Sequence, residues 1–193
     1  EPFVLAAPEE HELARREHGP DPHLERAAAA TERTDHLIED LLDLARSGTD
    51  VEEAEPVILA EVASQAWASI DAAGASMTVA DPLTVSADPS RLRQALENLF
   101  RNAVEHGGDD VTVTVRAVEG GFAVDDDGPG FPADTDVLEW GVTTASEGTG
   151  FGLSIVSEVA RAHGWTVETG TSPAGGARVT FRDVELEPAD DAG

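Results

Sequence analysis

The sequence predicts an α+β domain with a mixed or antiparallel sheet, preceded by a helical hairpin. Up to residue 48 the apolar residues recur at helical spacing. From Val57 on, helical segments alternate with short runs in which apolar and polar residues alternate, as they do in strands. Two pairs of such runs flank glycine-containing turns, which is the pattern of a β-hairpin and implies antiparallel strands.

The helical hairpin is expected over residues 1–48. Residues 9–18 have the pattern of a helix end, and a turn follows in which Asp21 suits the N-cap and Pro22 the first helical position. Apolar residues three and four apart then form one stripe from Leu24 to Ala45, and Gly48 suits the C-terminal cap. Two helices alone cannot bury such a stripe, so we expect a second copy to complete a four-helix bundle.

The α+β domain is expected over residues 57–187. An acidic segment, 49–56, is expected to be the linker before it, and 188–193 an acidic tail after it. We expect helices at 57–70, at 89–106 with Asp88 as N-cap, and at 152–163, and strands at 77–79, 83–85, 111–115, 122–124, 165–167 and 178–181. Residues 128–150 lack a sustained period and are expected to form a long loop, which in a compact domain is usually functional.

The charge of the chain excludes some function classes. The 193 residues carry 39 Asp and Glu against 12 basic residues, all of them Arg, for a net charge of −27. A nucleic-acid-binding protein would show a basic face, so no nucleic-acid partner is expected. Self-repulsion of this size destabilises a compact state unless salt screens it, and the composition resembles that of haloarchaeal cytoplasmic proteins. The chain has no cysteine and no apolar run long enough to span a membrane, and we expect a cytoplasmic location.

Three short segments contain the chemistry. Asn98 and Asn102 are four residues apart and share one face of the helix expected at 89–106. Asn is a poor residue inside a helix, and its carboxamide oxygen is a hard ligand that suits Mg²⁺ held jointly with phosphates. In isolation, two surface or core asparagines are the favoured explanation of the pattern.

The second segment is Asp126 to Gly130, just after a strand-like run. A carboxylate at a strand end can accept a hydrogen bond from an exocyclic amine, which favours adenine over guanine; a turn aspartate is the alternative. Gly128 and Gly130 would allow the backbone to approach a base and ribose. In the third segment Gly148, Gly150 and Gly152 precede a helix, where open backbone amides bind anions; the alternative is a flexible hinge.

In this order, the segments resemble the catalytic and ATP-binding domain of sensor histidine kinases, within the Bergerat-type ATPase superfamily. Residues 98–102 look like the N box, 126–130 the first glycine box and 148–153 the second, and 137–140 stand in place of the phenylalanine box with Trp as the aromatic residue. Residues 31–46 are similar to the second helix of that family's dimerisation and phosphoacceptor domain, so that the resemblance extends over roughly 21–187.

The resemblance implies a two-layer α/β sandwich that binds ATP and Mg²⁺. It implies that Asn102 and Asn98 meet the metal and the phosphates, that Asp126 recognises adenine, and that residues 128–150 form an ATP lid. The residues it implies at the nucleotide are Asn98, Asn102, His106, Asp126, Gly128, Gly130, Gly148, Thr149, Gly150, Phe151, Gly152, Leu153 and Thr180. Glu105 stands where many members have Lys. The implied partners are a second copy of the chain and a response-regulator receiver domain.

One position discriminates within the superfamily. Water-activating members carry Glu four residues before the metal-binding Asn, where this chain has Asn98, which cannot act as a general base. Histidine needs less deprotonation, because neutral imidazole is already nucleophilic. We therefore expect phosphoryl transfer to a histidine, with an ATPase of the gyrase or chaperone class and a non-catalytic ATP-binding or dimerisation module as alternatives.

The phosphoacceptor is expected outside this chain. Glu1-Pro2-Phe3 resembles the tail of an acceptor box, which would put the acceptor histidine just upstream of Glu1. His11, His18, His23 and His36 are expected to be solvated helix residues. Any membrane attachment is expected to lie in parts absent from this chain.

Overall fold

The computed structural model describes residues 54–72, 74–108, 110–132 and 152–187. The helical hairpin expected at 1–48, residues 133–150 of the expected lid, Phe151 and the tail at 188–193 lie outside the described residues.

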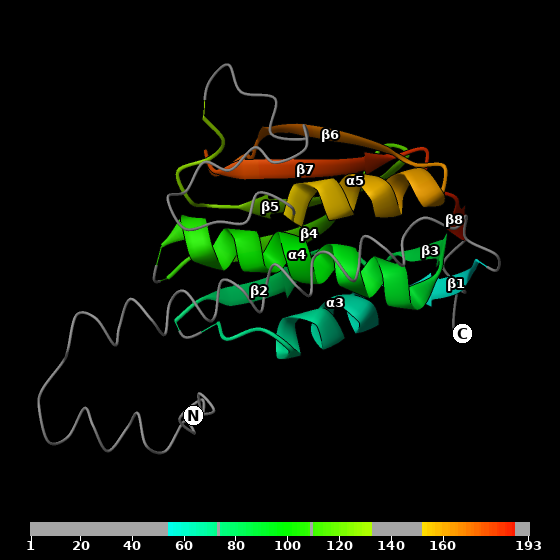
Figure 1. The fold of residues 1–193 in the computed structure, drawn as a ribbon, viewed down its shortest axis with the longest axis horizontal. Coiled ribbons are helices and arrows are strands. Elements are labelled where there is room, and N and C mark those ends of the chain that lie inside the picture. Colours follow the sequence, from blue (N-terminus) through cyan, green and yellow to red (C-terminus); the bar gives the residue numbers. More distant parts are fainter. Residues whose placement is uncertain (1–53, 73, 109, 133–151, 188–193) are drawn as a thin grey trace, which may run out of the picture.

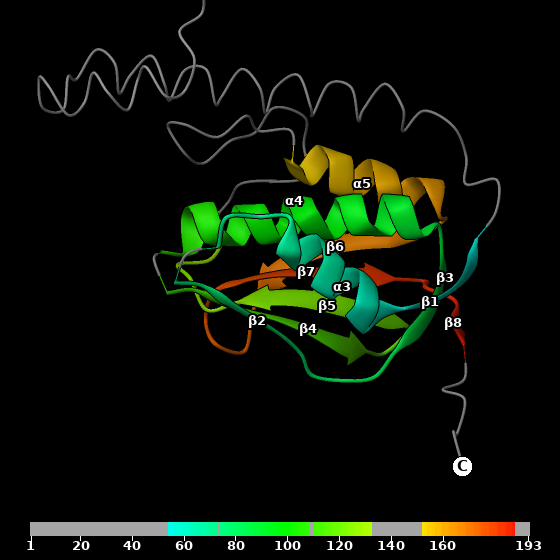
Figure 2. The same ribbon diagram turned by 90° about the horizontal axis from the view of Figure 1, so that it is seen from below.

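The described residues form two layers, with helices over one face of a five-stranded sheet and a smaller three-stranded sheet at one end (Figure 1). Turned by 90°, the molecule shows α4 and α5 side by side above the strands (Figure 2). The elements in chain order are β1 (Glu55–Ile58), α3 (Leu59–Ala68), β2 (Ser76–Val79), β3 (Thr84–Ala87), α4 (Pro89–Gly107), β4 (Thr112–Val118), β5 (Gly121–Asp126), α5 (Gly152–Ala162), β6 (Thr166–Thr171), β7 (Ala177–Arg182) and β8 (Leu186–Glu187).

The large sheet is mixed, as the sequence predicts. Its order is β2-β4-β5-β7-β6, with β2 parallel to β4 and all other neighbours antiparallel. The β4–β5 and β6–β7 pairs are the two hairpins expected from the turns. The small sheet has the order β1-β3-β8 and is antiparallel. The central position of β5 puts its C-terminal residue, Asp126, between two strands.

The core lies between the helices and one face of the large sheet. Phe122 of β5 stacks on Phe181 of β7 with ring centroids 4.5 Å apart, and Trp165 meets both rings edge-on. On the helix side, Trp67 of α3 packs edge-on against the buried Phe100 of α4. Aromatic pairs of these kinds contribute beyond their buried area. The first set joins β5 to β7, and the Trp67–Phe100 pair joins α3 to α4.

Helix α4 starts where the sequence predicts. The Asp88 side chain accepts hydrogen bonds from the backbone N–H groups of Ser90 and Arg91, and Pro89 takes the first helical position. The apolar face of the helix is buried, which leaves its orientation over the sheet little freedom.

Two short strands differ from the sequence-based expectation. Residues 55–58 form β1, although we expected 49–56 to be a linker and a helix to begin at Val57. The apolar run Val57-Ile58-Leu59 fits a strand and a helix equally well, and the partner that decides between them, β3, is almost thirty residues away. Strand β8 was not expected, since two residues carry no periodicity.

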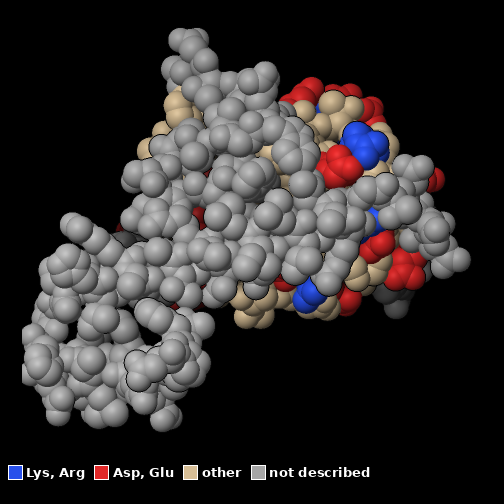
Figure 3. Space-filling model, in the orientation of Figure 1, with Lys and Arg blue, Asp and Glu red and all other residues tan. Residues whose placement is uncertain are grey.

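Where described residues are visible in the space-filling view, acidic side chains surround a few arginines (Figure 3). Among the described helices, none combines the length and the apolar character that crossing a bilayer requires.

Candidate nucleotide-binding site

Helix α4 presents the two asparagines on one face, one turn apart. Asn98 is buried, with 6% of its surface exposed, and Asn102 is partly buried. The Asn98 Nδ2 donates to the carbonyl oxygen of Gln94 at 3.0 Å, which fixes the orientation of the carboxamide, and Oδ1 accepts no hydrogen bond from a described residue. A buried amide with one satisfied end is a pre-oriented oxygen ligand.

The start of α5 lies directly against these amides. A Cβ atom added to Gly152 would lie 3.2 Å from Asn102 Oδ1 and 3.4 Å from Asn98 Oδ1. Gly152 is thus the position at which the helix backbone approaches both asparagines closely. Because the first N–H groups of a helix have no partner within the helix, the amide groups of α4 lie beside backbone donors that α5 itself does not use.

Asp126 ends β5 with a carboxylate that is half engaged. Its Oδ1 accepts hydrogen bonds from the backbone N–H groups of Gly128 and Ala177, each at 2.9 Å. Its Oδ2 makes no hydrogen bond to a described residue. Two backbone donors therefore orient the carboxylate and leave one oxygen to accept a hydrogen bond from a ligand.

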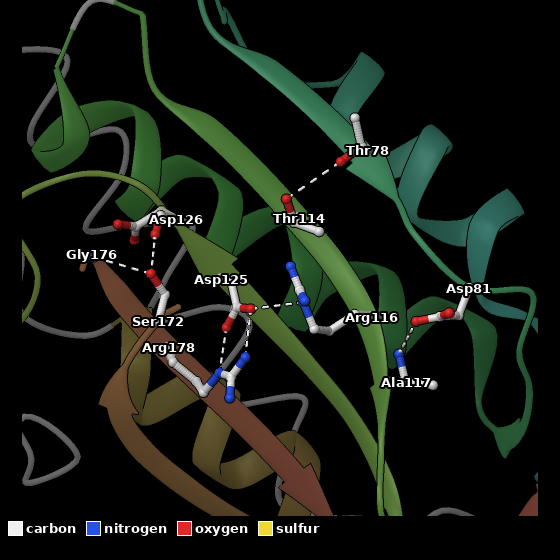
Figure 4. A network of polar contacts seen from close by, with 10 residues as sticks. All are labelled: Thr78, Asp81, Thr114, Arg116, Ala117, Asp125, Asp126, Ser172, Gly176 and Arg178. Carbon is white, nitrogen blue, oxygen red and sulfur yellow. Dashed lines mark hydrogen bonds and ion pairs between the residues drawn. The ribbon is translucent and has the colours of Figure 1, made fainter. Parts of the chain in front are cut away.

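The turn between β6 and β7 makes hydrogen bonds to Asp126. The Ser172 hydroxyl donates to the Asp126 carbonyl oxygen at 2.6 Å and accepts from the Gly176 N–H at 3.0 Å (Figure 4). A Cβ on Gly176 would collide with the carbonyl and the carboxylate of Asp126, so only glycine permits this approach. Sequence reasoning missed Ser172, Gly176 and Ala177, whose contributions are mostly backbone atoms; the glycine pair at 175–176 was the only signal.

Gly128 and Gly130 follow Asp126 on the same side. Gly128 lies against the backbone of Gly107 at the end of α4, and Gly130 has a positive φ of 78° and lies beside the turn at 175–176. The segment after Asp126 is therefore held between α4 and the β6–β7 turn, which places a carboxylate, a glycine backbone and the asparagine helix around one region.

Asp125, one residue earlier, points to the helix-free face of the sheet. It is buried and lies between two arginines of the neighbouring strands: Arg178 Nε is 2.6 Å from Oδ1, and Arg116 Nε is 2.9 Å from Oδ2 (Figure 4). The carboxylate raises the pKa of Arg178 through their hydrogen bonds. This ionic cluster joins β4, β5 and β7 at the level where Asp126 leaves the sheet.

His163 joins the far ends of the two site helices. Its Nε2 accepts from the Asp88 N–H at 2.9 Å, its Nδ1 donates to the Val159 carbonyl oxygen at 2.7 Å, and its ring stacks on Trp165. Burial lowers the pKa of His163 below its ordinary value of 6.5, so the neutral ring is favoured. The neutral form with hydrogen on Nδ1 matches both partners.

The residue before Asn98 is turned away from the site. Glu97 accepts a hydrogen bond at 2.9 Å from Ser69, the C-cap residue of α3, and its Oε1 lies 3.7 Å from Arg93 Nε. Its carboxylate therefore faces α3, whereas the asparagines face α5. The Glu97 carboxylate is therefore engaged by Ser69 and Arg93, away from the face that carries Asn102.

Not every expected site residue joins this cluster. Leu153 follows Gly152 on α5, partly buried, and His106 lies exposed in the last turn of α4. Thr180 is buried on β7, but its neighbours Val179 and Phe181 face the core, so Thr180 lies on the helix-free face, away from the asparagines. Gly148, Thr149, Gly150 and Phe151 lie outside the described residues.

The arrangement fits a magnesium nucleotide. Two carboxamide oxygens and open helix N–H groups suit a metal-bound phosphate chain, and the free oxygen of Asp126 suits an exocyclic amine. The glycines at 152 and 176 leave free of side chains the two places where a Cβ would press on these polar groups.

The fold and site define a nucleotide-binding domain of the ATPase class. The chain belongs to the family of histidine kinase-, DNA gyrase B- and HSP90-like ATPases, since the model of that family matches residues 87–188. Its Bergerat-type ATP-binding domain is of the histidine kinase kind, since the named relatives are sensor histidine kinases.

Curated relatives resemble most of this chain. It is 37% identical over 169 residues to the probable sensor histidine kinase TcrY of Mycobacterium tuberculosis, which covers 78% of this chain and 35% of TcrY. It is 33% identical over 192 residues to the histidine-protein kinase AfsQ2 of Streptomyces coelicolor, covering 90% of this chain and 35% of AfsQ2. The chain thus spans about a third of the length of these relatives.

Solved structures agree with the fold. Full-length ShkA in complex with AMPPNP has a TM-score of 0.63 at 31% identity, covering 93% of this chain and 42% of ShkA. The ATP-binding domain of PrrB from Mycobacterium tuberculosis has a TM-score of 0.52 at 28% identity, covering 72% of this chain and all of that domain (100%).

Proposed function

We propose that this chain is the kinase core of a two-component sensor histidine kinase. It binds Mg·ATP between α4, residues 126–130 and the start of α5, and directs the γ-phosphoryl group to a histidine, from which it passes to an aspartate of a response-regulator receiver domain. The observation that carries the proposal is the convergence of Asn98, Asn102 and the backbone of Gly152.

In this proposal each group acts by binding and orienting. The amide oxygens of Asn98 and Asn102 hold the metal side of the phosphate chain, the N–H groups at the start of α5 hold phosphate oxygens, and Asp126 Oδ2 accepts from the adenine amine. When bound, Mg²⁺ neutralises charge on the phosphates, and positioning with charge neutralisation is most of phosphoryl-transfer catalysis. No lysine contributes, because the chain has none.

Titration with Mg·ATP tests the site. We expect Asn102→Ala to weaken ATP binding at least about tenfold, the loss of one charge-assisted contact. Gln65→Ala, which truncates an exposed carboxamide on α3, is the matched control and should bind as the wild type does. Removing Mg²⁺ with EDTA should weaken ATP binding by the wild type more than it weakens ATP binding by Asn102→Ala. If neither the wild type nor Asn102→Ala binds ATP detectably, a non-catalytic module is favoured instead.

Phosphate release separates the kinase from an ATPase of the gyrase or chaperone class. Because Asn98 replaces the base and Glu97 faces Ser69, we expect no sustained ATP hydrolysis. Steady Mg²⁺-dependent phosphate release that disappears in Glu97→Gln would assign the base role to Glu97 and overturn the kinase proposal.

We also propose that the protein is halophilic, cytoplasmic and dimeric through the helices expected at 1–48. The net charge of −27 supports the first point, since at 1 M salt the Debye length falls to about 3 Å. We expect the melting temperature to rise steeply with KCl up to molar concentration. An unchanged value between low and molar KCl contradicts this. Sedimentation at molar KCl tests the dimer.

A further inference from the structure

Ser172 supplies a hydrogen bond that the sheet itself does not provide. The pairing of β5 with β7 ends at Asp125 and Arg178. The next amide of β7, that of Ala177, donates to the Asp126 carboxylate and not to its carbonyl oxygen. The Ser172 hydroxyl donates to that carbonyl oxygen at 2.6 Å and so takes the place of the missing ladder bond.

The same residue closes the turn that approaches Asp126. The Ser172 hydroxyl accepts from Gly176 at 3.0 Å, and its backbone N–H donates to the Gly176 carbonyl oxygen at 2.9 Å. Ser172 is buried, with 5% of its surface exposed, so water does not easily replace these bonds. The turn ends at Ala177, whose N–H holds Asp126 Oδ1.

We propose that Ser172 is a positioning residue for adenine recognition. It holds the 172–177 turn against the end of β5, and the turn holds the Asp126 carboxylate with Oδ2 directed at the exocyclic amine. Ser172 itself touches no part of the nucleotide. The proposal rests on the proposed function, since it assigns to Ser172 the specificity of that same site.

The perturbation that tests this is Ser172→Ala in the full chain. Loss of the hydroxyl leaves the Asp126 carbonyl oxygen and the Gly176 N–H without their partner, so the turn loosens and the carboxylate loses its fixed direction. We expect ATP binding to weaken about 3- to 10-fold, the worth of one net hydrogen bond, while GTP binding is unchanged. The preference for ATP over GTP falls by the same factor.

Three further variants make the comparison specific. Ser172→Thr keeps the hydroxyl and should retain the ATP preference. Ser69→Ala is the matched control, because Ser69 also makes two short hydrogen bonds, to the Ala66 carbonyl oxygen and to Glu97, but away from Asp126. If Ser172→Ala does not fold, the nearly isosteric Ser172→Cys, whose thiol is a weak donor, supplies the same comparison.

Amide hydrogen exchange gives a second reading without nucleotide. In Ser172→Ala the amides of Gly176 and Ala177 should exchange faster, with the core amides of β5 unchanged. The proposal is overturned if the wild type prefers ATP and Ser172→Ala keeps that preference, or if Ser172→Thr loses as much as Ser172→Ala. A wild type that binds no ATP overturns the proposed function itself, and the two failures are thereby distinguished.

Discussion

Replacing Asp126 by Asn should separate the structural role of this side chain from its role in recognition. In the protein, Oδ1 accepts two backbone hydrogen bonds, and Oδ2 accepts none from the residues that the structure describes. An Asn side chain can keep its oxygen on the two N–H groups, but its Nδ2 then presents hydrogen where adenine also presents hydrogen. Turning the amide over would face its NH₂ group with both backbone donors, so neither orientation satisfies protein and ligand together.

The magnitudes follow from these contacts. In Asp126→Asn the two backbone bonds lose only their charge assistance, about 1–2 kcal/mol in all. In Asp126→Ala both N–H groups lose their acceptor, and because both residues are partly exposed we expect about 2–3 kcal/mol, a fall in melting temperature of about 5–10 °C. Either variant should bind ATP about 10- to 100-fold more weakly, the worth of a charge-assisted hydrogen bond.

The assay is calorimetric titration with Mg·ATP and Mg·GTP at molar KCl, with thermal unfolding of the same samples. Asp127→Asn is the matched control: it removes the same charge one residue later, where the carboxylate accepts from the Thr112 N–H outside the site. The reasoning is refuted if Asp126→Asn binds ATP within about threefold of the wild type, or if Asp127→Asn loses as much affinity.

Three other perturbations have definite expected outcomes. Gly152→Ala puts a Cβ against the Asn98 and Asn102 amides, so ATP binding should weaken about tenfold, while the higher helix propensity of Ala offsets any loss of stability. The control is Gly170→Ala, whose added Cβ meets nothing within 4 Å and which should bind ATP as the wild type does. Equal ATP affinities of the Gly152→Ala and Gly170→Ala variants would contradict this. Burial lowers the pKa of His163, so the unfolded state binds more protons and the free energy of unfolding should decrease as pH falls below 6.5. The variant His163→Gln should flatten this pH dependence, which urea unfolding between pH 7.5 and 5.5 measures. If the free energy of unfolding depends on pH as steeply in the variant as in the wild type, the prediction is contradicted. Asp125→Ala leaves two arginines without their shared carboxylate and should lower the free energy of unfolding by about 2–3 kcal/mol, less than for a fully buried ion pair because both guanidinium groups are partly exposed. Urea unfolding measures this loss. A loss below about 0.5 kcal/mol, typical of a surface substitution, would contradict a stabilising role of the cluster.

The sequence predicted those parts of the fold whose information is local. Helix α4 has a cap, a proline and an apolar stripe within its own residues, and the two hairpins have alternating runs around glycine turns. Strand β1 was not predicted, because Val57 and Ile58 become strand residues only through pairing with β3. The parallel neighbour of β4 is likewise a consequence of topology, which no short segment encodes.

In the candidate site, too, some residues could be predicted from the sequence and others could not. Asn98, Asn102, Gly152 and Asp126 were predicted from residue type and spacing, and the structure brings the first three together. The groups that orient Asp126 are N–H groups of Gly128 and Ala177 and the hydroxyl of Ser172, and backbone donors leave no residue-type signature. Thr180 was identified from family resemblance alone, and the alternation of β7 places it on the other face of the sheet.

The two hydrogen bonds on Asp126 Oδ1 also relate the site to the order of folding. One donor is two residues away, in a turn that can form early, whereas the other is 51 residues away, across the return of β6 and β7 to the sheet. Local hairpins close within microseconds, and pairings across long loops are slower because of the entropy of closure. The carboxylate is therefore fully oriented only after the last central strand has docked, so gain of ATP affinity during refolding would report completion of the fold and not its beginning.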